Sequence, residues 1–532
     1  DHWADFTTIA PDWFSTKREA EKLLPVAETL SVISAIEKKG IPYPKDHIDE
    51  AMWRLCEFDD HCWATSSKNP LVMHKFNLNL VKRESARTAK RIVDNIIDMS
   101  INNDKDTNMV AVWNVIPALR TTMIKLNNGK ELKGVVCQKL SSGETITEPV
   151  SLPPYGYKTF EIKDAIAEEQ TTDCDENGII ETKFYIVLCC METHKIISII
   201  DKKTSEELID KTSKYSLGDF VYTYSQAKHE KGISIEIARR RSFIIKRGQL
   251  AIEIIKTGYE EQIGANVSCT TILYTHEKNI DVVLKFENAT GLMGDYYDRY
   301  KKNIFFAFPF KLENLHFCTE LAGGIVDETK DRLPINPHDF VVAQRWVTAQ
   351  NQTRGIALFS KDMPVFHLGD IHYDEISSRV SFNKSANIFV YAASNRCNQL
   401  NFTEPKECFG NYEFSILPYV GKCEDSIPMW SVEKTYTPLI GTADTGTLEK
   451  SYFSIDKNNV RMTAFKKCDD EDCFIARFIE ISGKKTEVSF KLPFIVASSE
   501  LTNGIEEGTG AFCKTNGDTV SFTIDEFSYI TL

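Results

Sequence analysis

The period of the hydrophobic pattern changes near residue 103, and this change constrains the fold more than any other feature. Before that point, apolar residues recur every three to four positions, as expected for amphipathic helices. From Met109–Asn114 onward, short apolar–polar alternations are separated by glycine, proline and asparagine turns, which is typical of strands. No later stretch has a persuasive helical period. We therefore predict an α+β multidomain protein, with a three-helix bundle followed by all-β sandwich domains.

The three helices are predicted from apolar spacing and from their start and stop signals. Ser15 is a suitable N-cap for the first helix, and Gly40 and Pro42 follow its end. In the second helix, Ile48, Met52 and Leu55 form one apolar stripe. The predicted bounds are Ser15–Lys39, Lys45–His61 and Leu71–Met99.

The length of 532 residues is too great for one hydrophobic core and indicates several domains. The predicted domains are a helical bundle at 1–105, a small β-sandwich at 106–165, a large β-sandwich at 166–427 and a C-terminal β-sandwich at 428–532. The net charge of −13 argues against a nucleic-acid partner. No apolar run approaches the roughly 20 residues that cross a bilayer, so no membrane partner is expected.

Cysteine usage indicates a reducing compartment. Fourteen cysteines in 532 residues fall short of disulfide density. Cys189 and Cys190 are neighbours on a predicted strand and so point to opposite faces. We expect mostly reduced thiols and a cytoplasmic location. Two alternatives stay open: a signal peptide upstream of Asp1, and a metal or disulfide set formed by Cys397, Cys408 and Cys423 with the pair Cys468 and Cys473.

A histidine lies among three acidic and two aromatic residues at the predicted end of the second helix. The stretch reads Glu57-Phe58-Asp59-Asp60-His61-Cys62-Trp63. A histidine in such company is a candidate metal ligand or acid–base group. Without further context, a helix-end histidine that caps carbonyls or pairs with Glu57 is the simpler reading. At about 100° per residue, His61 falls about 140° from the apolar stripe and so points away from the bundle core.

This stretch resembles the F-D-E-H-T-W-G signature of bacterial glycoside hydrolase family 38, the α-mannosidases, and the H-H-D-x-x-T-G-T of its eukaryotic members. Further resemblances follow in the family's order along the whole chain. They are Asp1–Phe6 (G-D-W-x-D-W-W), Val112–Val115 with Arg120-Thr121 (V-V-F-N-P…R-T), Pro153–Tyr157 (P-P-L-G-Y), Phe306–Phe310, Gln344–Val347, Phe414–Gly421 (L-x-P-H-x-G) and Phe474–Glu480 (I-V-R-x-x-E). The resemblance implies that the large sandwich is a galactose-mutarotase-like supersandwich.

The resemblance also implies a chemistry. Family members are zinc-dependent retaining α-mannosidases, and their nucleophile, acid/base and most zinc ligands lie in an N-terminal barrel that this chain does not match. His61 is then the zinc ligand from the helical domain, and Asp60 is a substrate-binding candidate. The expected partners are a mannose-containing oligosaccharide and the missing barrel. Cys62 and Ala64 depart from the family pattern, which puts neighbouring contacts in doubt but removes no ligand.

The chain by itself is expected to be inactive, because it holds no catalytic residues by this resemblance. We also expect it to self-associate, possible homo-oligomers included, because a barrel-facing apolar surface is left open. The rival hypothesis is a stand-alone carbohydrate-binding or structural module. His372 and Asp374 repeat the spacing of the barrel's zinc pair, but two alternating strand residues describe them equally well.

Overall fold

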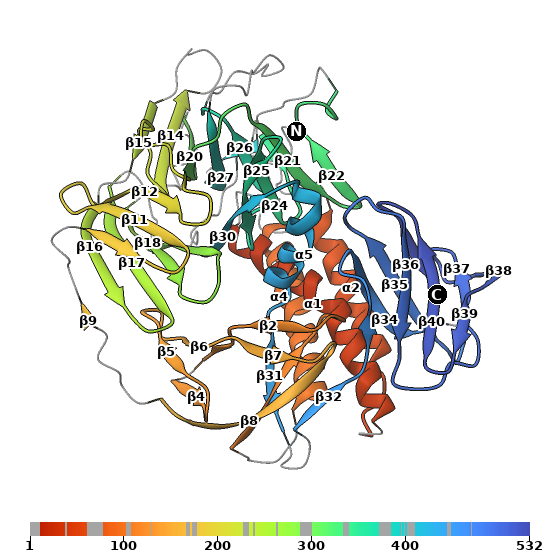
Figure 1. Ribbon diagram of the computed structural model, residues 1–532. Helices are drawn as coiled ribbons and strands as arrows, with labels where there is room; N and C mark the ends of the chain where they lie inside the picture. The colour runs from red at the N-terminus through yellow and green to blue at the C-terminus, as the bar shows by residue number, and fades with distance from the viewer. Residues whose placement is uncertain are drawn as a thin grey trace. The chain divides into compact units, whose positions relative to one another are not determined.

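The computed structural model describes most of the chain (Figure 1). The described residues are 11–37, 40–60, 78–102, 108–127, 129–165, 171–172, 178–226, 234–237, 240–261, 264–287, 300–333, 340–371, 385–394, 396–397, 400–401, 410–443, 448–469 and 471–532. Within these ranges, no helix is both long enough and apolar enough to span a bilayer. Helices near the N-terminus and antiparallel sheets after residue 108 confirm the predicted α+β class.

Four helices lie in the described ranges: α1 (Pro11–Ile36), α2 (Lys45–Asp59), α4 (Leu78–Ile101) and α5 (Cys423–Thr435). The predicted start of α1 at Ser15 is wrong. The helix begins four residues earlier at Pro11, whose fixed φ suits the first helical position. Ser15 lies inside the helix, and its Oγ donates a 2.6 Å hydrogen bond to Oδ1 of Asp362.

The predicted apolar stripe of α2 is wrong at one position. The buried residues are Ile48, Ala51, Leu55 and Phe58, whereas the side chain of Met52 is 50% exposed. Ala51 lies 100° from Met52 on the helix and takes its place in the core. Spacing alone does not separate these two assignments, because both give contiguous stripes.

Helix α5 is not predicted from the sequence, which instead places the boundary between the domains 166–427 and 428–532 inside this helix. Its buried residues include Cys423, Ile427, Ser431 and Val432, a mixture of apolar and polar side chains. Pro428 also lies inside the helix. The prediction depends on apolar residues at helical spacing, and a buried stripe that contains serine does not show that period. A proline inside the segment also argues against a helix.

Contacts divide the chain into two compact units, each discontinuous in sequence. The first comprises the described parts of Asp1–Thr16, Asp60–Glu84 and Glu169–Cys423, and the second those of Lys17–Asp59, Ser85–Glu168 and Glu424–Leu532.

The first unit consists largely of antiparallel sheets (Figure 1), whose buried side chains form a large aromatic-rich core and a smaller second cluster. Its ten-stranded sheet has the order β22 (Gly324–Asp327), β21 (His316–Leu321), β24 (Trp346–Gln350), β25 (Arg354–Ser360), β30 (Gly410–Val420), β19 (Ile280–Glu287), β18 (Ala265–Tyr274), β17 (Ala251–Glu260), β16 (Arg240–Arg247) and β9 (Thr171–Thr172). Its six-stranded sheet has the order β15 (Ser234–Ile237), β14 (Asp219–Gln226), β20 (Tyr300–Phe310), β27 (Ala386–Ser394), β26 (Val365–Leu368) and β23 (Phe340–Val342).

Two smaller sheets complete this unit. They are β10 (Ile179–Glu181), β11 (Tyr185–Cys190), β12 (Lys195–Asp201) and β13 (Glu206–Glu207), and the pair β28 (Arg396–Cys397) and β29 (Leu400–Asn401). Alternate residues of the large sheets face the core, where Phe306 contacts Phe220, Tyr412 and Phe414 at ring separations of 5.0, 5.2 and 5.8 Å. Strand alternation therefore buries one face of each sheet against the other, as in a sandwich.

In the second unit, the helices α1, α2 and the part of α4 after Ser85 share one core with the adjoining strands. The five-stranded sheet comprises β31 (Leu439–Thr442), β1 (Met109–Asn114), β8 (Gly156–Asp164), β32 (Glu449–Ser451) and β4 (Lys130–Leu132). Strands β31 and β32 follow the predicted domain boundary at residue 428, yet they pair with strands that precede residue 165. This sheet is completed by a segment far along the chain, which local sequence patterns do not reveal.

The remaining sheets of this unit are short and antiparallel. Two of them are β2 (Arg120–Thr122) with β7 (Val150–Leu152), and β3 (Lys125–Leu126), β6 (Thr145–Thr147) and β5 (Cys137–Lys139). The C-terminal sandwich has two sheets. One has the order β33 (Ser454–Ile455), β36 (Thr486–Lys491), β40 (Thr519–Ile524) and β39 (Lys514–Asn516). The other has the order β34 (Val460–Lys467), β35 (Phe474–Glu480), β41 (Tyr529–Thr531), β37 (Glu500–Thr502) and β38 (Gly508–Phe512). Phe478 of one sheet contacts Phe490 and Phe522 of the other at 5.0 and 4.8 Å.

Candidate functional site

The predicted site residue Asp60 lies directly after the last residue of α2 and is exposed. Its backbone carbonyl accepts a hydrogen bond from Nζ of Lys82 in α4. His61, the predicted zinc ligand, lies outside the described residues, as do Cys62 and Trp63. The role of His61 stays a prediction.

The last turn of α2 is fixed by ion pairs to its neighbours within the second unit. Nζ of the buried Lys17 in α1 lies 3.0 Å from Oδ2 of Asp59. Oε2 of Glu57 accepts a 3.0 Å bond from Arg54 and a hydrogen bond from the Ser85 hydroxyl of α4. These bonds set where the chain leaves the helix. The alternative that Glu57 pairs with His61 stays a prediction, because His61 lies outside the described residues.

One face of α2 carries exposed apolar side chains. Met52 is 50% exposed and Trp53 is 68% exposed, and Cys56 one turn later is exposed as well. A helix normally presents polar residues to water and apolar residues to a core. An exposed tryptophan and methionine on the helix that leads to Asp60 are therefore typical of a surface that another structure covers.

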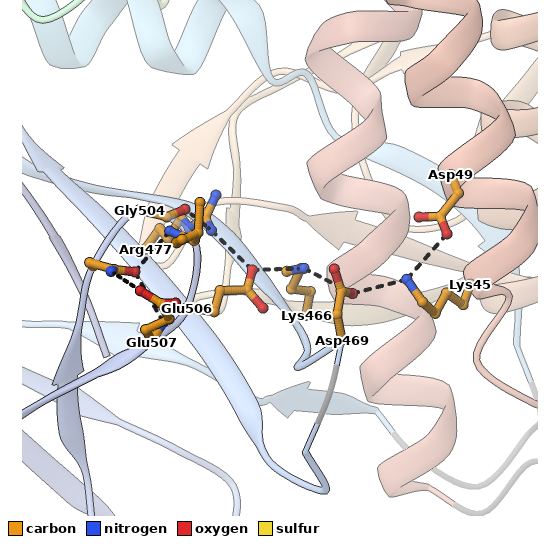
Figure 2. A network of polar contacts seen from close by, with 10 residues as sticks. Lys45, Asp49, Lys466, Asp469, Arg477, Gly504, Glu506 and Glu507 are labelled. Atoms are coloured by element: carbon orange, nitrogen blue, oxygen red, sulfur yellow. Dashed lines mark hydrogen bonds and ion pairs between the residues drawn. The ribbon is translucent and has the colours of Figure 1, made fainter.

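A chain of ion pairs joins the start of α2 to the C-terminal sandwich within the second unit (Figure 2). Nζ of Lys45 lies 3.1 Å from both Asp49 and Asp469. Lys466 then lies 3.3 Å from Asp469 and 2.8 Å from Glu506. Arg477 continues the chain with a 3.0 Å bond to Glu506 and a 3.1 Å bond to the carbonyl of Gly504.

Glu28 of α1 lies in the field of this ion-pair network and is only 9% exposed. Burial raises the pKa of Glu28 to about 7, against the opposing effect of Lys466 and Arg477, and Asp469 and Glu506 raise it further. A carboxyl with such a pKa is able to act as a general acid. However, a retaining glycosidase needs a second carboxylate about 5–5.5 Å away as nucleophile. The nearby Asp469 and Glu506 are instead bound to lysine, so we interpret the network as structural.

Two hollows among the described residues of the second unit bear on function. A cavity of about 30 Å³ beside α1 is lined by Thr29, Val115, Tyr155 and Arg461 among others, and it has room for a water molecule. A groove of about 490 Å³ on the C-terminal sandwich is lined by Tyr452, Phe494, Lys491 and Asp518 among others. Only the groove has room for a sugar ring. Sequence reasoning missed both it and Glu28, because their neighbours come from segments far apart in the chain.

His372 and Asp374, which repeat the spacing of the barrel's zinc pair, lie outside the described residues. Cys468 and Cys473 flank the turn between β34 and β35, and the Cys468 amide donates to the Cys473 carbonyl at 3.0 Å. No disulfide joins the cysteine side chains that the structure describes.

Comparison with solved structures defines the class of the fold. An alpha-mannosidase from Enterococcus faecalis V583 superposes with a TM-score of 0.70 at 11% identity, over 99% of this chain and 68% of that chain. A protein in glycosyl hydrolase family 38 from Enterococcus faecalis gives a TM-score of 0.65 at 12% identity, over 99% of this chain and 70% of that chain. This chain therefore has the multidomain fold of about two thirds of each relative.

A sequence match covers part of the C-terminal sandwich. Residues 459–528 match the family of glycosyl hydrolases family 38 C-terminal beta sandwich domains. A comparison with curated proteins gives no match. The chain therefore carries a domain that matches this C-terminal β-sandwich model, and its fold is similar to that of the two solved proteins along nearly its whole length.

Proposed function

We propose that this chain is the helical and β-sandwich part of a zinc-dependent retaining α-mannosidase that hydrolyses terminal α-mannosides of glycans. The observation that supports this proposal most is the fold match over 99% of the chain to an alpha-mannosidase. The remaining third of that relative has no counterpart in these 532 residues. In the proposal, that third corresponds to a catalytic barrel that supplies both carboxylates.

In this proposal, Asp60 and His61 extend from the end of α2 toward the barrel. His61 is the zinc ligand of the helical domain, and Asp60 contacts substrate. The exposed position of Asp60 is compatible with that role, and the exposed face formed by Met52 and Trp53 offers the barrel an apolar surface. Bound zinc would act as a Lewis acid on sugar oxygens. The residues of this chain would hold the ligand set and the substrate in place.

The test compares the 532-residue chain with a protein in which the catalytic barrel is joined to it, using an aryl α-mannoside as substrate. The 532-residue chain should show no turnover, and the joined protein should show metal-dependent turnover. His61→Ala should lower kcat/KM by at least roughly 100-fold, since even second-shell changes at zinc sites cost 10- to 100-fold. His47→Ala, at an exposed histidine of α2, is the matched control and should have little effect.

Proton NMR of the first product would show retention or inversion at the anomeric carbon. Turnover by the 532-residue chain alone, lost in His61→Ala and on chelation, would contradict the requirement for a barrel. Inversion would contradict the retaining mechanism while leaving the substrate class intact.

A carbohydrate-binding role without catalysis is the second candidate, and the groove of about 490 Å³ on the C-terminal sandwich favours it. Aromatic side chains such as Phe494 commonly stack on sugar rings. Binding of the 532-residue chain to a glycan array, weakened by Phe494→Ala and unaffected by His61→Ala, would support this second function over the first.

The cytoplasmic location belongs to the same proposal. It is supported by the lack of disulfides among the described cysteine side chains, because disulfides persist mainly in oxidising compartments.

A further inference from the structure

Four metal-binding or hydrogen-bonding side chains share one face at the end of the ten-stranded sheet. His316 and Cys318 are two residues apart on β21 and therefore point to the same side. Asp327 of the edge strand β22 pairs directly with Cys318, and Gln350 of β24 pairs directly with His316. Phe317, between the two ligands, points to the opposite face and into the core. The strand register thus brings all four together without any loop.

Three of these side chains offer ligand atoms at short range. The ligand atoms of His316, Cys318 and Asp327 all lie within 4.8 Å of one another, and His316 Nε2 lies 3.8 Å from Asp327 Oδ2. In a tetrahedral site with bonds of 2.0–2.3 Å, ligand atoms are roughly 3.3–3.8 Å apart. The histidine–aspartate separation already meets this requirement, and no other separation needs to shorten by more than roughly 1.5 Å.

Hydrogen bonds orient these side chains. Gln350 Nε2 lies 3.1 Å from His316 Nε2 and 3.0 Å from Cys318 Sγ, so one amide bridges two of the ligand atoms. The Tyr419 hydroxyl in turn donates to Gln350 Oε1 at 2.8 Å. Tyr419 reaches Gln350 across Gly355, where an added Cβ would come within 2.3 Å of the tyrosine oxygen. Thr329 donates to Asp327 Oδ1 through its amide and its hydroxyl, at 3.0 and 2.6 Å.

We propose that His316, Cys318 and Asp327 form a zinc site on the large β-sandwich, separate from the catalytic zinc of the proposed function. A thiolate, an imidazole and a carboxylate form a ligand set suited to Zn²⁺. Cys318 is 4% exposed, while the His316 and Asp327 side chains are 25% and 13% exposed. The site is therefore largely enclosed with one open side, where water completes the coordination.

A lysine competes with the metal for one ligand. Lys330 Nζ lies 2.6 Å from Asp327 Oδ2, and its side chain is 72% exposed, so it is able to turn into solvent. Bound zinc would take over this carboxylate and tie the edge strand β22 to β21. The metal would thus be structural, protecting a sheet edge whose outer strand β22 has only one partner strand in the described sheet.

The test uses Co²⁺ as a spectroscopic probe on the intact chain after metal removal by chelator. We expect one Co²⁺ per chain, with a thiolate-to-cobalt charge-transfer band that Zn²⁺ abolishes by displacement. Cys318→Ser should remove the band, and His316→Gln should weaken Co²⁺ affinity by more than roughly 100-fold. Cys468→Ser and the double variant His61→Ala/Cys62→Ser are controls for other thiols, and both should keep the band.

A second variant keeps the proposal testable if the ligand variants misfold. Lys330→Met removes an exposed competitor and should tighten Co²⁺ binding about two- to fivefold, the range expected for a surface ion pair. Absence of a thiolate band in the unaltered chain, or its loss in the two control variants instead of Cys318→Ser, would overturn the site. Unchanged affinity in Lys330→Met would overturn the assignment of Asp327 as a ligand.

Discussion

Glu28 shows how tertiary packing changes the chemistry of a single residue. It belongs to α1, whereas the cations and carboxylates that act on it belong to β34, the following turn, β35 and the loop after β37. Charge neutralisation by Lys466 and Arg477 only partly offsets the loss of water around the carboxylate. The carboxyl is therefore uncharged in the folded chain at mildly acidic pH, where an exposed glutamate is ionised.

This pKa predicts a pH-dependent stability. The folded chain holds the Glu28 proton up to about pH 7, while the unfolded chain releases it near the ordinary value of 4.5. The contribution of Glu28 to the free energy of unfolding should therefore be greatest below pH 4.5. This contribution should be lost as the pH rises from 4.5 through 7. Glu28→Gln should remove this loss, which amounts to at most about 3 kcal/mol. Urea unfolding as a function of pH measures it.

The exposed Glu21 on the same helix provides the matched control, and Glu21→Gln should leave the slope between pH 4.5 and 7 unchanged. An identical slope in Glu28→Gln and the unaltered chain would show that burial does not act on this carboxyl as described.

At the scale of elements, α5 depends on a partner outside the helix. The last carbonyls of a helix have no hydrogen-bond donors within the helix. Here the guanidinium of Arg120 on β2 donates hydrogen bonds at this end of α5. Arg120 donates to the carbonyl of Glu433 at 2.7 Å and also to that of Tyr436. A buried cation at the C-terminal end of a helix also meets the negative end of the helix dipole.

Replacing this arginine should destabilise α5. Arg120→Met removes both charge-assisted hydrogen bonds from a buried position and should lower the free energy of unfolding by about 2–3 kcal/mol. Arg120→Lys keeps the charge but loses the paired donors, so an intermediate loss is expected. Chemical denaturation of the three proteins compares them directly. Equal stability of Arg120→Met and the unaltered chain would mean that water replaces the guanidinium without cost.

For the whole molecule, the exposed apolar face of α2 predicts association. Met52 and Trp53 together present an uncovered apolar surface, which favours contact with another surface. In the absence of a barrel, we expect the contacting surface to belong to a second copy of the chain. Sedimentation velocity should show concentration-dependent association that Met52→Gln/Trp53→Gln abolishes. Ile495→Gln, at an exposed residue of the C-terminal sandwich, should not change it. A chain that stays monomeric at every concentration would count against this surface being an interface.

The sequence by itself determined the element types and the resemblance to family 38, because both depend on local information. Helical spacing up to Ile101 and alternation from Met109 are properties of neighbouring residues, and family landmarks are short segments in a set order. Local patterns missed α5, whose buried face includes Ser431 and whose interior holds Pro428.

Only the tertiary structure decided which distant residues share an environment. The raised pKa of Glu28 requires β34 and β35 beside α1, more than 400 residues along the chain. The His316–Cys318 spacing is visible in the sequence, but Asp327 and Gln350 join them only through the register of β22 and β24. Burial and strand register are set by long-range packing, and no single segment carries that information.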